Sequence, residues 1–122
     1  MLHRATDDYW HVVAGVVEDG ETFAEAAARE LREETGLDAV VSDVGMRQSY
    51  RVPEAMRSEY LAGVDEVAVE NFAVEVQPGW EPVLNEEHDH YRWLTPTEAV
   101  AIAHWPETKE ILGAIARPKL RS

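Results

Sequence analysis

Three glutamates stand close together early in the chain: Glu30, Glu33 and Glu34. On a helix, residues three and four apart share a face, so these carboxylates would lie on one arc. Carboxylates one turn apart repel each other on a plain surface helix, whereas Mg²⁺ and Mn²⁺ prefer clustered oxygen ligands. A solvated acidic helix face would carry the same residues. The spacing therefore permits a divalent-metal site without requiring one.

The residues around the glutamates predict the helix that would position them. Thr22 is a suitable N-cap with Glu25 three residues later, as in a capping box. Gly36 is a suitable C′ residue, followed by the apolar Leu37. We therefore expect a helix from about Phe23 to Thr35. Its small and apolar residues would pack on a core: Ala24, Ala27, Ala28, Leu31 and Thr35.

The spacing over the whole stretch is more specific than the glutamates alone. Gly15 is followed after five residues by Glu21 and after seven more by the run RELREETGL, residues 29–37. This pattern resembles the Nudix box at every defined position, so the chain is identified as a member of the Nudix hydrolase family. The resemblance implies an α/β fold, an α/β/α sandwich with a mixed β-sheet. It also implies hydrolysis of a phosphoanhydride with bound Mg²⁺ (or Mn²⁺).

The resemblance implies a role for each residue of the box. Glu30, Glu33 and Glu34 are the expected metal ligands and catalytic carboxylates, and the backbone carbonyl of Ala14 is implied as a further metal contact. A bound divalent ion would neutralise phosphate charge and make a water nucleophilic. Arg29 is expected to pair with a glutamate rather than to touch the substrate. The residues expected to shape or brace the loop and helix are Gly15, Glu21, Arg29 and Gly36.

A second acidic pair, Glu86 and Glu87, precedes a predicted short strand at residues 88–94. The segment EHDHYRWL resembles the EHxxYxW pattern of several Nudix subgroups, which favours Glu87 as a further metal ligand or as the general base. The same two residues could instead form a solvated Glu-Glu turn, and Glu30 competes with Glu87 for the role of base.

The histidines are weaker candidates for metal binding than the glutamates. His88 and His90 are two residues apart and should share one face of the strand. They could form a metal pair, but no third soft ligand stands near them, so zinc is not expected. Tyr91 and Trp93 would share the other face and enter the core. His11 is expected to be a surface or structural residue.

Residues outside the box must select the substrate. The candidate phosphate donors and stacking rings are Arg4, Trp10, Arg47, Arg51, Arg57 and Tyr60. Three arginines, Arg47, Arg51 and Arg57, are conspicuous against so acidic a background, although each could also be a solvated surface charge.

The order of motifs resembles the dihydroneopterin triphosphate and dATP pyrophosphohydrolases, beginning with DDYWHVVAG at residues 7–15. That resemblance implies cleavage of a nucleoside or pterin triphosphate, or of a related nucleoside diphosphate-X compound, to a monophosphate and pyrophosphate. Three further functions fit the same motifs: an oxidised-guanine triphosphatase, a dinucleoside polyphosphate hydrolase of the diadenosine tetraphosphate type, and a nucleotide-binding module without catalysis.

Composition limits the remaining function classes. The 122 residues predict a single domain over 1–122, and the absence of cysteine excludes thiol catalysis, disulfides and Cys-ligated zinc. A net charge of −13 opposes binding of nucleic acid polymers. A small polyphosphate would need divalent cations between itself and the carboxylates. No 18-residue apolar run is present, so we expect a cytoplasmic protein without a membrane partner.

Other patterns predict the elements around the box. We expect a strand over 10–17, one or two strands over 38–51, a loop over 52–62, a strand over 64–77, a helix ending near His104 and a last helix containing Ile111, Leu112 and Ile115. Little sequence precedes Trp10, so the N-terminal strand is expected to be short or missing. Either the chain is truncated, or a homodimer partner or strand exchange completes the sheet edge.

Overall fold

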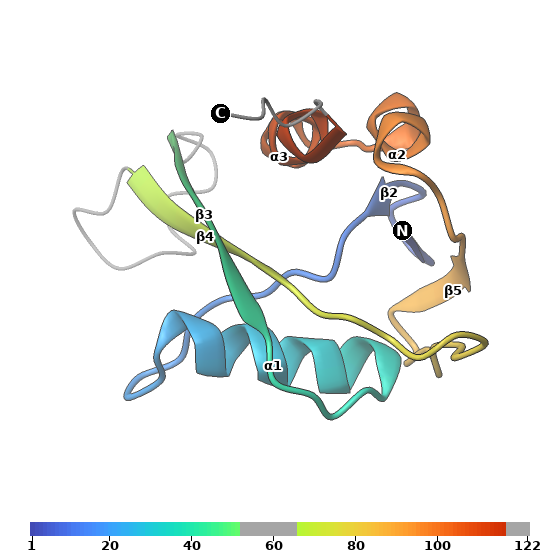
Figure 1. Cartoon of the computed structure of the whole chain (residues 1–122), viewed down its shortest axis with the longest axis horizontal. Coiled ribbons are helices and arrows are strands. Elements are labelled where there is room, and N and C mark those ends of the chain that lie inside the picture. The colour runs from blue at the N-terminus through green and yellow to red at the C-terminus, as the bar shows by residue number, and fades with distance from the viewer. Residues whose placement is uncertain (52–65, 117–122) are drawn as a thin grey trace, which may run out of the picture.

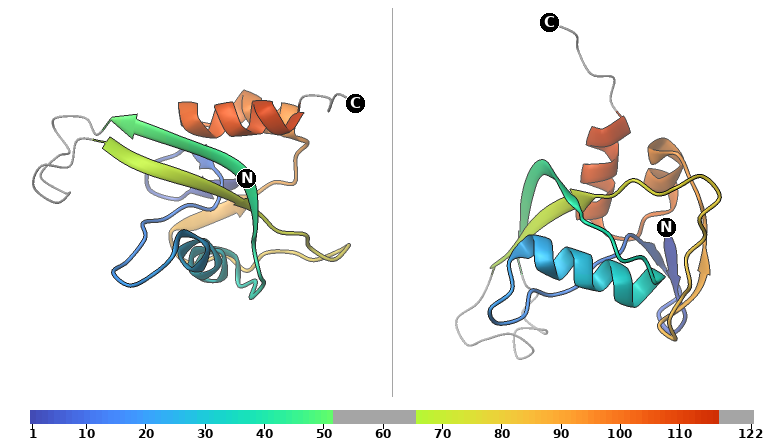
Figure 2. Two further views of the ribbon diagram at one scale, coloured as in Figure 1. Left: turned by 60° about the vertical axis from the view of Figure 1, so that its left-hand side comes forward. Right: turned by 60° about the horizontal axis from the view of Figure 1, so that its bottom comes forward.

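The computed structural model of the chain describes residues 1–51 and 66–116. Its elements are β1 (Leu2–Arg4), β2 (Trp10–His11), α1 (Phe23–Thr35), β3 (Ser42–Arg51), β4 (Glu66–Ala73), β5 (His88–Tyr91), α2 (Pro96–Ile102) and α3 (Pro106–Ala116). Figures 1 and 2 show α1 on one side of the β3–β4 pair and α3, with α2 beside it, on the other. The architecture is the α/β fold expected from the sequence.

The described strands form two antiparallel sheets, with the orders β2-β1-β5 and β3-β4. Among the described residues, a parallel pairing occurs as an isolated bridge between Trp10 and Ala103. The N-terminal strand β1 is as short as expected, at three residues. It lies in the middle of its sheet, between β2 and β5. The homodimer or strand exchange stays a prediction.

Helix α1 has the bounds that its capping residues predict. The Glu25 N–H donates to Thr22 Oγ1 at 3.1 Å, and the Thr22 N–H donates to Glu25 Oε1 at 2.9 Å. Gly36 ends the helix with φ of 79° and donates its N–H to the carbonyl of Arg32. A left-handed conformation of this kind favours glycine. The helix that carries the box glutamates is therefore fixed at both ends by its own sequence.

Loss of the N-cap should destabilise the domain measurably. Thr22→Ala removes the acceptor for one otherwise unpaired N–H of the first turn, so we expect a loss of about 1 kcal/mol in the free energy of unfolding. Urea denaturation followed by circular dichroism measures this difference. Thr22→Ser keeps the hydroxyl and should retain most of the stability; equal losses in both variants would contradict the role of the cap.

Several strands differ from their expected lengths. β2 ends at His11 instead of near residue 17, because the following backbone is used by the box loop: the carbonyl of Val16 accepts from Arg29, and the Glu18 N–H donates to Glu21. β4 and β5 are shorter than the expected spans 64–77 and 88–94, and α2 ends at Ile102. The loop predicted over 52–62 lies outside the described residues.

The buried face of α1 is rotated from the expected one. Its buried residues are Ala26, Leu31, Glu34 and Thr35, whereas Ala24 is exposed. The other buried apolar residues come from β1 and the C-terminal helices: Leu2, Ala99, Ala103 and Ile111. The core therefore covers the face that carries Glu34. No helix in the described parts of the chain has the length and apolarity needed to cross a membrane.

Candidate functional site

Glu34 is the box glutamate that the fold buries. It lies in the last turn of α1 and is 4% exposed. The Ala14 N–H donates to its Oε2 at 3.3 Å. Burial, with the negative charge of Glu30 as the next cause, raises the pKa of Glu34 to about 8. A bound divalent metal ion would stabilise the ionised form of this buried carboxyl, and its oxygen donors fit such an ion.

Arg29 ties the other acids of the box together. Its Nε donates to Glu21 at 2.7 Å, and its Nη1 donates to Glu30 at 2.8 Å and lies 3.3 Å from Glu33. Its Nη2 donates to the carbonyl of Val16 at 2.9 Å. The hydrogen bond from Arg29 lowers the pKa of Glu21. Arg29 thus joins the acidic loop to the helix, and Glu21 has a position that braces the loop.

Gly15 is required by close packing against a glutamate. A Cβ atom on Gly15 would overlap the carboxyl group of Glu30. The side chain of Glu30 is only 17% exposed and accepts a hydrogen bond from Arg29. The box glycine therefore leaves the space into which this carboxylate fits.

Glu87 approaches the box from the loop before β5. Its negative charge contributes to the raised pKa of Glu34. Arg4 Nη1 lies 3.4 Å from Glu87 Oε2, and the Glu87 side chain is 58% exposed. The Ala5 N–H also donates to the carbonyl of Glu87 at 3.0 Å. The structure thus places Glu87 and Arg4, two of the predicted site residues, together beside the box.

Two histidines next to Glu34 were not predicted to belong to the site. His11 is 7% exposed and His88 is 3% exposed. Their Nε2 atoms are 2.8 Å apart, and His88 Nε2 lies 3.5 Å from Glu34 Oε1. Burial lowers the pKa of His11 to about 4, and burial also lowers the pKa of His88. Both rings are therefore neutral near pH 7.

The expectation that His88 and His90 share a face is wrong. The register of β5 against β1 shifts between His3 and Arg4, which pair with His90 and His88, so Asp89 is an extra residue in the ladder. A bulge of this kind reverses the alternation of side chains, and His90 is exposed while His88 is buried.

Two aromatic residues also differ from expectation, because they do not enter the core. Tyr91 is 36% exposed and Trp93 is 57% exposed. The bulge in β5 has no identifiable signal in the sequence. For His11, the only sequence feature that could have indicated burial is its position next to Trp10 on the strand before the box.

Two of the predicted substrate-binding residues, Trp10 and Arg47, lie on different strands and have different contacts. Trp10 packs against His3, with ring centroids 5.0 Å apart, and the guanidinium of Arg92 lies 5.8 Å from its ring. Since side chains alternate along a strand, Trp10 points away from the side on which its neighbour His11 meets Glu34. Arg47 lies on β3 and pairs with Glu70 at 3.2 Å.

The remaining candidates stay predictions. Arg51 is exposed at the end of β3, and Arg57 and Tyr60 lie outside the described residues.

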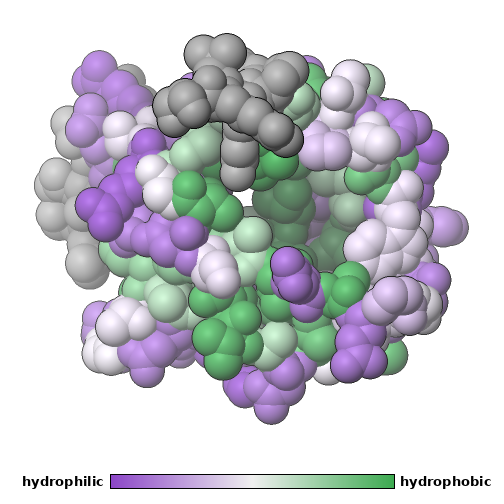
Figure 3. Space-filling view, in the orientation of Figure 1, coloured by the Kyte–Doolittle hydropathy of each residue, from purple (hydrophilic) through white to green (hydrophobic). Residues whose placement is uncertain are grey.

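A shallow pocket of about 510 Å³ lies between the start of α1 and the β3–β4 pair, lined among others by Phe23, Glu70 and Phe72. Figure 3 shows a molecular face that is hollowed at its centre, with hydrophobic residues around the hollow.

Comparisons with known proteins identify relatives over most of the chain. A dihydroneopterin triphosphate diphosphatase of Escherichia coli (strain K12) is 32% identical over 118 residues, covering 91% of this chain and 78% of the relative. An asymmetrical bis(5′-nucleosyl)-tetraphosphatase of Mus musculus is 34% identical over 117 residues, covering 92% of this chain and 74% of the relative. The match to an octanoyltransferase of Myxococcus xanthus is 38% identical over 86 residues, but it spans only 22% of that protein.

The fold has a solved counterpart with similar coverage. The structure of the E. coli dihydroneopterin triphosphate pyrophosphohydrolase superposes with a TM-score of 0.80 at 29% identity, covering 93% of this chain and 82% of that one. The family model described as NUDIX domain matches residues 1–114. The box residues, their helix and these matches agree, and the chain belongs to the Nudix hydrolase family.

Proposed function

We propose that this domain hydrolyses a phosphoanhydride bond of a nucleoside or pterin triphosphate in the presence of Mg²⁺ (or Mn²⁺), releasing a monophosphate and pyrophosphate. The observation that carries the proposal is the buried carboxyl of Glu34, held at the Ala14 N–H beside Glu30 and Glu87. The similarity to a diphosphatase of dihydroneopterin triphosphate supports the class of substrate.

Four glutamates would hold the metal ion in this proposal: Glu30, Glu33, Glu34 and Glu87. Such an ion would neutralise charge at the phosphate oxygens and would make a water nucleophilic. Arg29 keeps Glu30 and Glu33 in place through hydrogen bonds from its guanidinium. The Ala14 N–H orients Glu34 by donating to Oε2.

Glu87 is the better placed of the two candidates for the general base. The carboxylate of Glu30 already accepts a 2.8 Å hydrogen bond from Arg29, so it is less free to accept a hydrogen bond from a water. Glu87 is more exposed, and its contact with Arg4 is longer, at 3.4 Å. Arg4 would then serve as a donor to the phosphate chain beside the base.

A dinucleoside polyphosphate is the second candidate substrate. The observation that favours it is the similarity to the mouse tetraphosphatase, at 34% identity over most of the chain. The two classes differ in the group beyond the phosphate chain, so the residues that contact this group decide between them. The candidates for such contacts are Arg47, Arg51, Arg57 and Tyr60.

A substrate screen tests the proposal. The purified chain is incubated with Mg²⁺ and, separately, with dihydroneopterin triphosphate, dATP, 8-oxo-dGTP and diadenosine tetraphosphate, and the products are separated by ion-exchange chromatography. We expect Mg²⁺-dependent conversion of a triphosphate to a monophosphate and pyrophosphate. Preferred cleavage of diadenosine tetraphosphate would select the second candidate, and no turnover of any polyphosphate would reject both.

A further inference from the structure

A compact group of nitrogen and oxygen ligands includes the buried glutamate of the box. It consists of His11 on β2, His88 on β5 and Glu34 on α1, each from a different element. One ligand atom from each residue lies within 4.8 Å of the others, and all three residues are buried. The side chains of His88 and Glu34 are 0% and 5% exposed. Buried groups of this kind are costly unless they are paired or bind a cation.

The separations within this group are close to those around a small cation. Ligands at 2.0–2.2 Å from a tetrahedral metal lie about 3.3–3.6 Å from one another. His88 Nε2 and Glu34 Oε1 are 3.5 Å apart, which matches this spacing. The two Nε2 atoms are 2.8 Å apart, so a withdrawal of about half an ångström by His11 would admit an ion.

Hydrogen bonds fix the tautomer of His88, in which the unprotonated nitrogen faces His11 and Glu34. Asn85 Oδ1 accepts the N–H of Glu87 at 3.1 Å, which identifies this atom as the amide oxygen. The same oxygen lies 3.2 Å from His88 Nδ1, so Nδ1 carries the proton of the neutral ring. His88 Nε2 therefore presents its lone pair to His11 and Glu34. A metal-ligating histidine usually has this arrangement, in which the outer nitrogen donates to an oxygen.

In the metal-free protein, protons occupy the space between these side chains. The Nε2–H of His11 can donate to His88 Nε2 at 2.8 Å. Glu34 Oε1 lies 3.5 Å from the same nitrogen, and its raised pKa favours the protonated carboxyl. When Glu34 is ionised, lone pairs of all three side chains converge, and a cation can take the place of the shared protons. A dication with affinity for imidazole satisfies all three atoms together.

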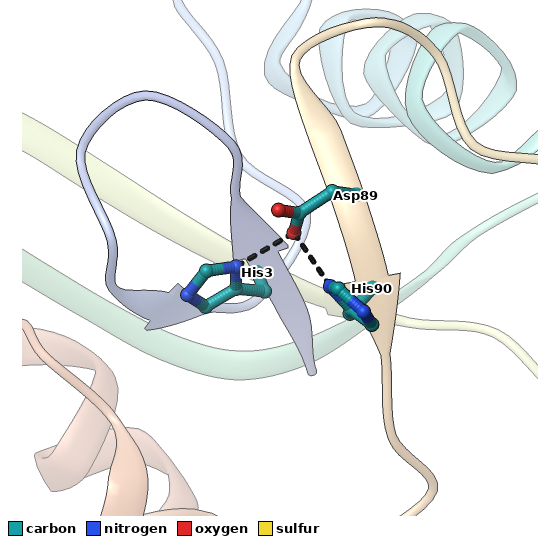
Figure 4. Close-up of side chains that lie close together, drawn as sticks. All are labelled: His3, Asp89 and His90. Atoms are coloured by element: carbon teal, nitrogen blue, oxygen red, sulfur yellow. Dashed lines mark hydrogen bonds and ion pairs between the residues drawn. The ribbon is translucent and has the colours of Figure 1, made fainter.

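Another group of histidines and an acid, His3, Asp89 and His90, is exposed or half-buried and differs in its hydrogen bonds. Figure 4 shows His3 and His90 turned toward Asp89, whose Oδ1 lies 2.6 Å from His3 Nδ1 and 3.0 Å from His90 Nδ1. His3 Nε2 also lies 2.8 Å from Asp8. The hydrogen bond to Asp89, followed by the one to Asp8, raises the pKa of His3. Here both nitrogens of His3 and Nδ1 of His90 face a carboxylate, so protons can satisfy these contacts without a metal ion.

We propose that His11, His88 and Glu34 bind a transition-metal dication such as Zn²⁺ or Co²⁺ through the two Nε2 atoms and Glu34 Oε1. Imidazole nitrogen favours zinc, cobalt and nickel, whereas Mg²⁺ selects oxygen ligands. The group is thus distinct in its chemistry from an all-carboxylate magnesium site, although it shares Glu34 with it. The inference goes beyond the proposed hydrolysis, and its test requires no substrate.

The test begins with the full chain after dialysis against a chelator. Co²⁺ is added while visible absorption is recorded, and Zn²⁺ binding is measured by calorimetry in the presence of excess Mg²⁺. Since the chain contains no cysteine, thiolate bands cannot contribute to the cobalt spectrum. We expect one Zn²⁺ per chain that excess Mg²⁺ does not displace, and cobalt bands typical of a low-coordinate nitrogen and oxygen site.

Matched histidine variants locate the ion. His11→Gln and His88→Asn should each weaken Zn²⁺ binding by at least about 100-fold, because each removes a direct ligand. His90→Asn, in the exposed cluster, should leave the affinity unchanged. Equal affinities in all three variants, a loss confined to His90→Asn, or no Zn²⁺ binding by the unmodified chain would overturn the proposal.

A measurement on the unmodified chain covers the case in which a variant fails to fold. Substoichiometric Co²⁺ broadens or shifts the NMR signals of nearby imidazole protons. We expect the ring signals of the two buried histidines to be affected first, and those of His3 and His90 to change only at excess metal. The reverse order would assign the metal to the surface cluster and contradict the proposed site.

Discussion

Glu34→Gln is expected to lower kcat by about 100-fold to 10,000-fold, since a metal ion supplies several kcal/mol of transition-state stabilisation and each 1.36 kcal/mol is a factor of ten. Glu34 is the most buried of the box acids, so the loss of its charge cannot be offset by solvent. The amide keeps an oxygen that can accept the Ala14 N–H. Steady-state kinetics on the substrate selected by the screen measures the effect.

The control for this variant separates chemistry from folding. In the metal-free protein, the raised pKa of Glu34 means that the folded state holds its proton more tightly than the unfolded state. The stability of the unmodified chain should therefore fall as pH rises from about 4.5 to about 8, and the E34Q protein should lack this fall. Glu86→Gln removes an exposed acid and should leave kcat unchanged. An E34Q protein with near-normal kcat would contradict the role of Glu34.

The elements that could be predicted from the sequence are those determined by local contacts. The bounds of α1 follow from Thr22, Glu25 and Gly36, whose hydrogen bonds and backbone conformation involve residues within the helix or next to it. The same reasoning applies to α2, where Thr95 and Glu98 form a second capping box. Interactions within one or two turns leave few competing conformations, so the carboxylate positions on α1 could be anticipated.

The positions of the histidines could not be predicted, because they depend on pairing between distant segments. His11 and His88 are separated by 77 residues and meet because β1 pairs with β2 on one side and with β5 on the other. The extra residue at Asp89 then decides which face of β5 enters the core. A shift of one residue in a strand exchanges its faces, and the sequence of the strand alone does not specify this shift.

The contacts of Arg29 could be predicted from the sequence only in part. Its position beside the carboxylate arc predicts pairing with a glutamate, and the structure shows hydrogen bonds to three acids and one carbonyl. The sequence could not show that the acidic loop folds back over the helix. A chain with a net charge of −13 thus uses one guanidinium to hold several like charges close to one another.

Gly15→Ala is expected to reduce turnover strongly through the displacement of a single carboxylate. The added methyl group would overlap the carboxyl of Glu30, and overpacking of this kind costs about 1–3 kcal/mol. The Glu30 side chain must move or the loop must open, which breaks the contact with Arg29. Because a displacement of about 1 Å at a catalytic group can cost 100-fold in rate, we expect a comparable loss of kcat/KM. Enzyme kinetics and Mg²⁺ titration followed by thermal unfolding measure both consequences.

Gly113→Ala provides the matched control, since it adds the same methyl group at an open site. Gly113 lies in α3 (Pro106–Ala116), and among the described residues no heavy atom outside the helix backbone and its chain neighbours lies within 4 Å of the position of its Cβ. Alanine is the better helix residue, so this variant should gain roughly 0.5–1 kcal/mol in the free energy of unfolding and keep its activity. The two substitutions therefore have opposite expected signs in stability. Equal kcat/KM values for them would show that Glu30 does not depend on the space left by Gly15.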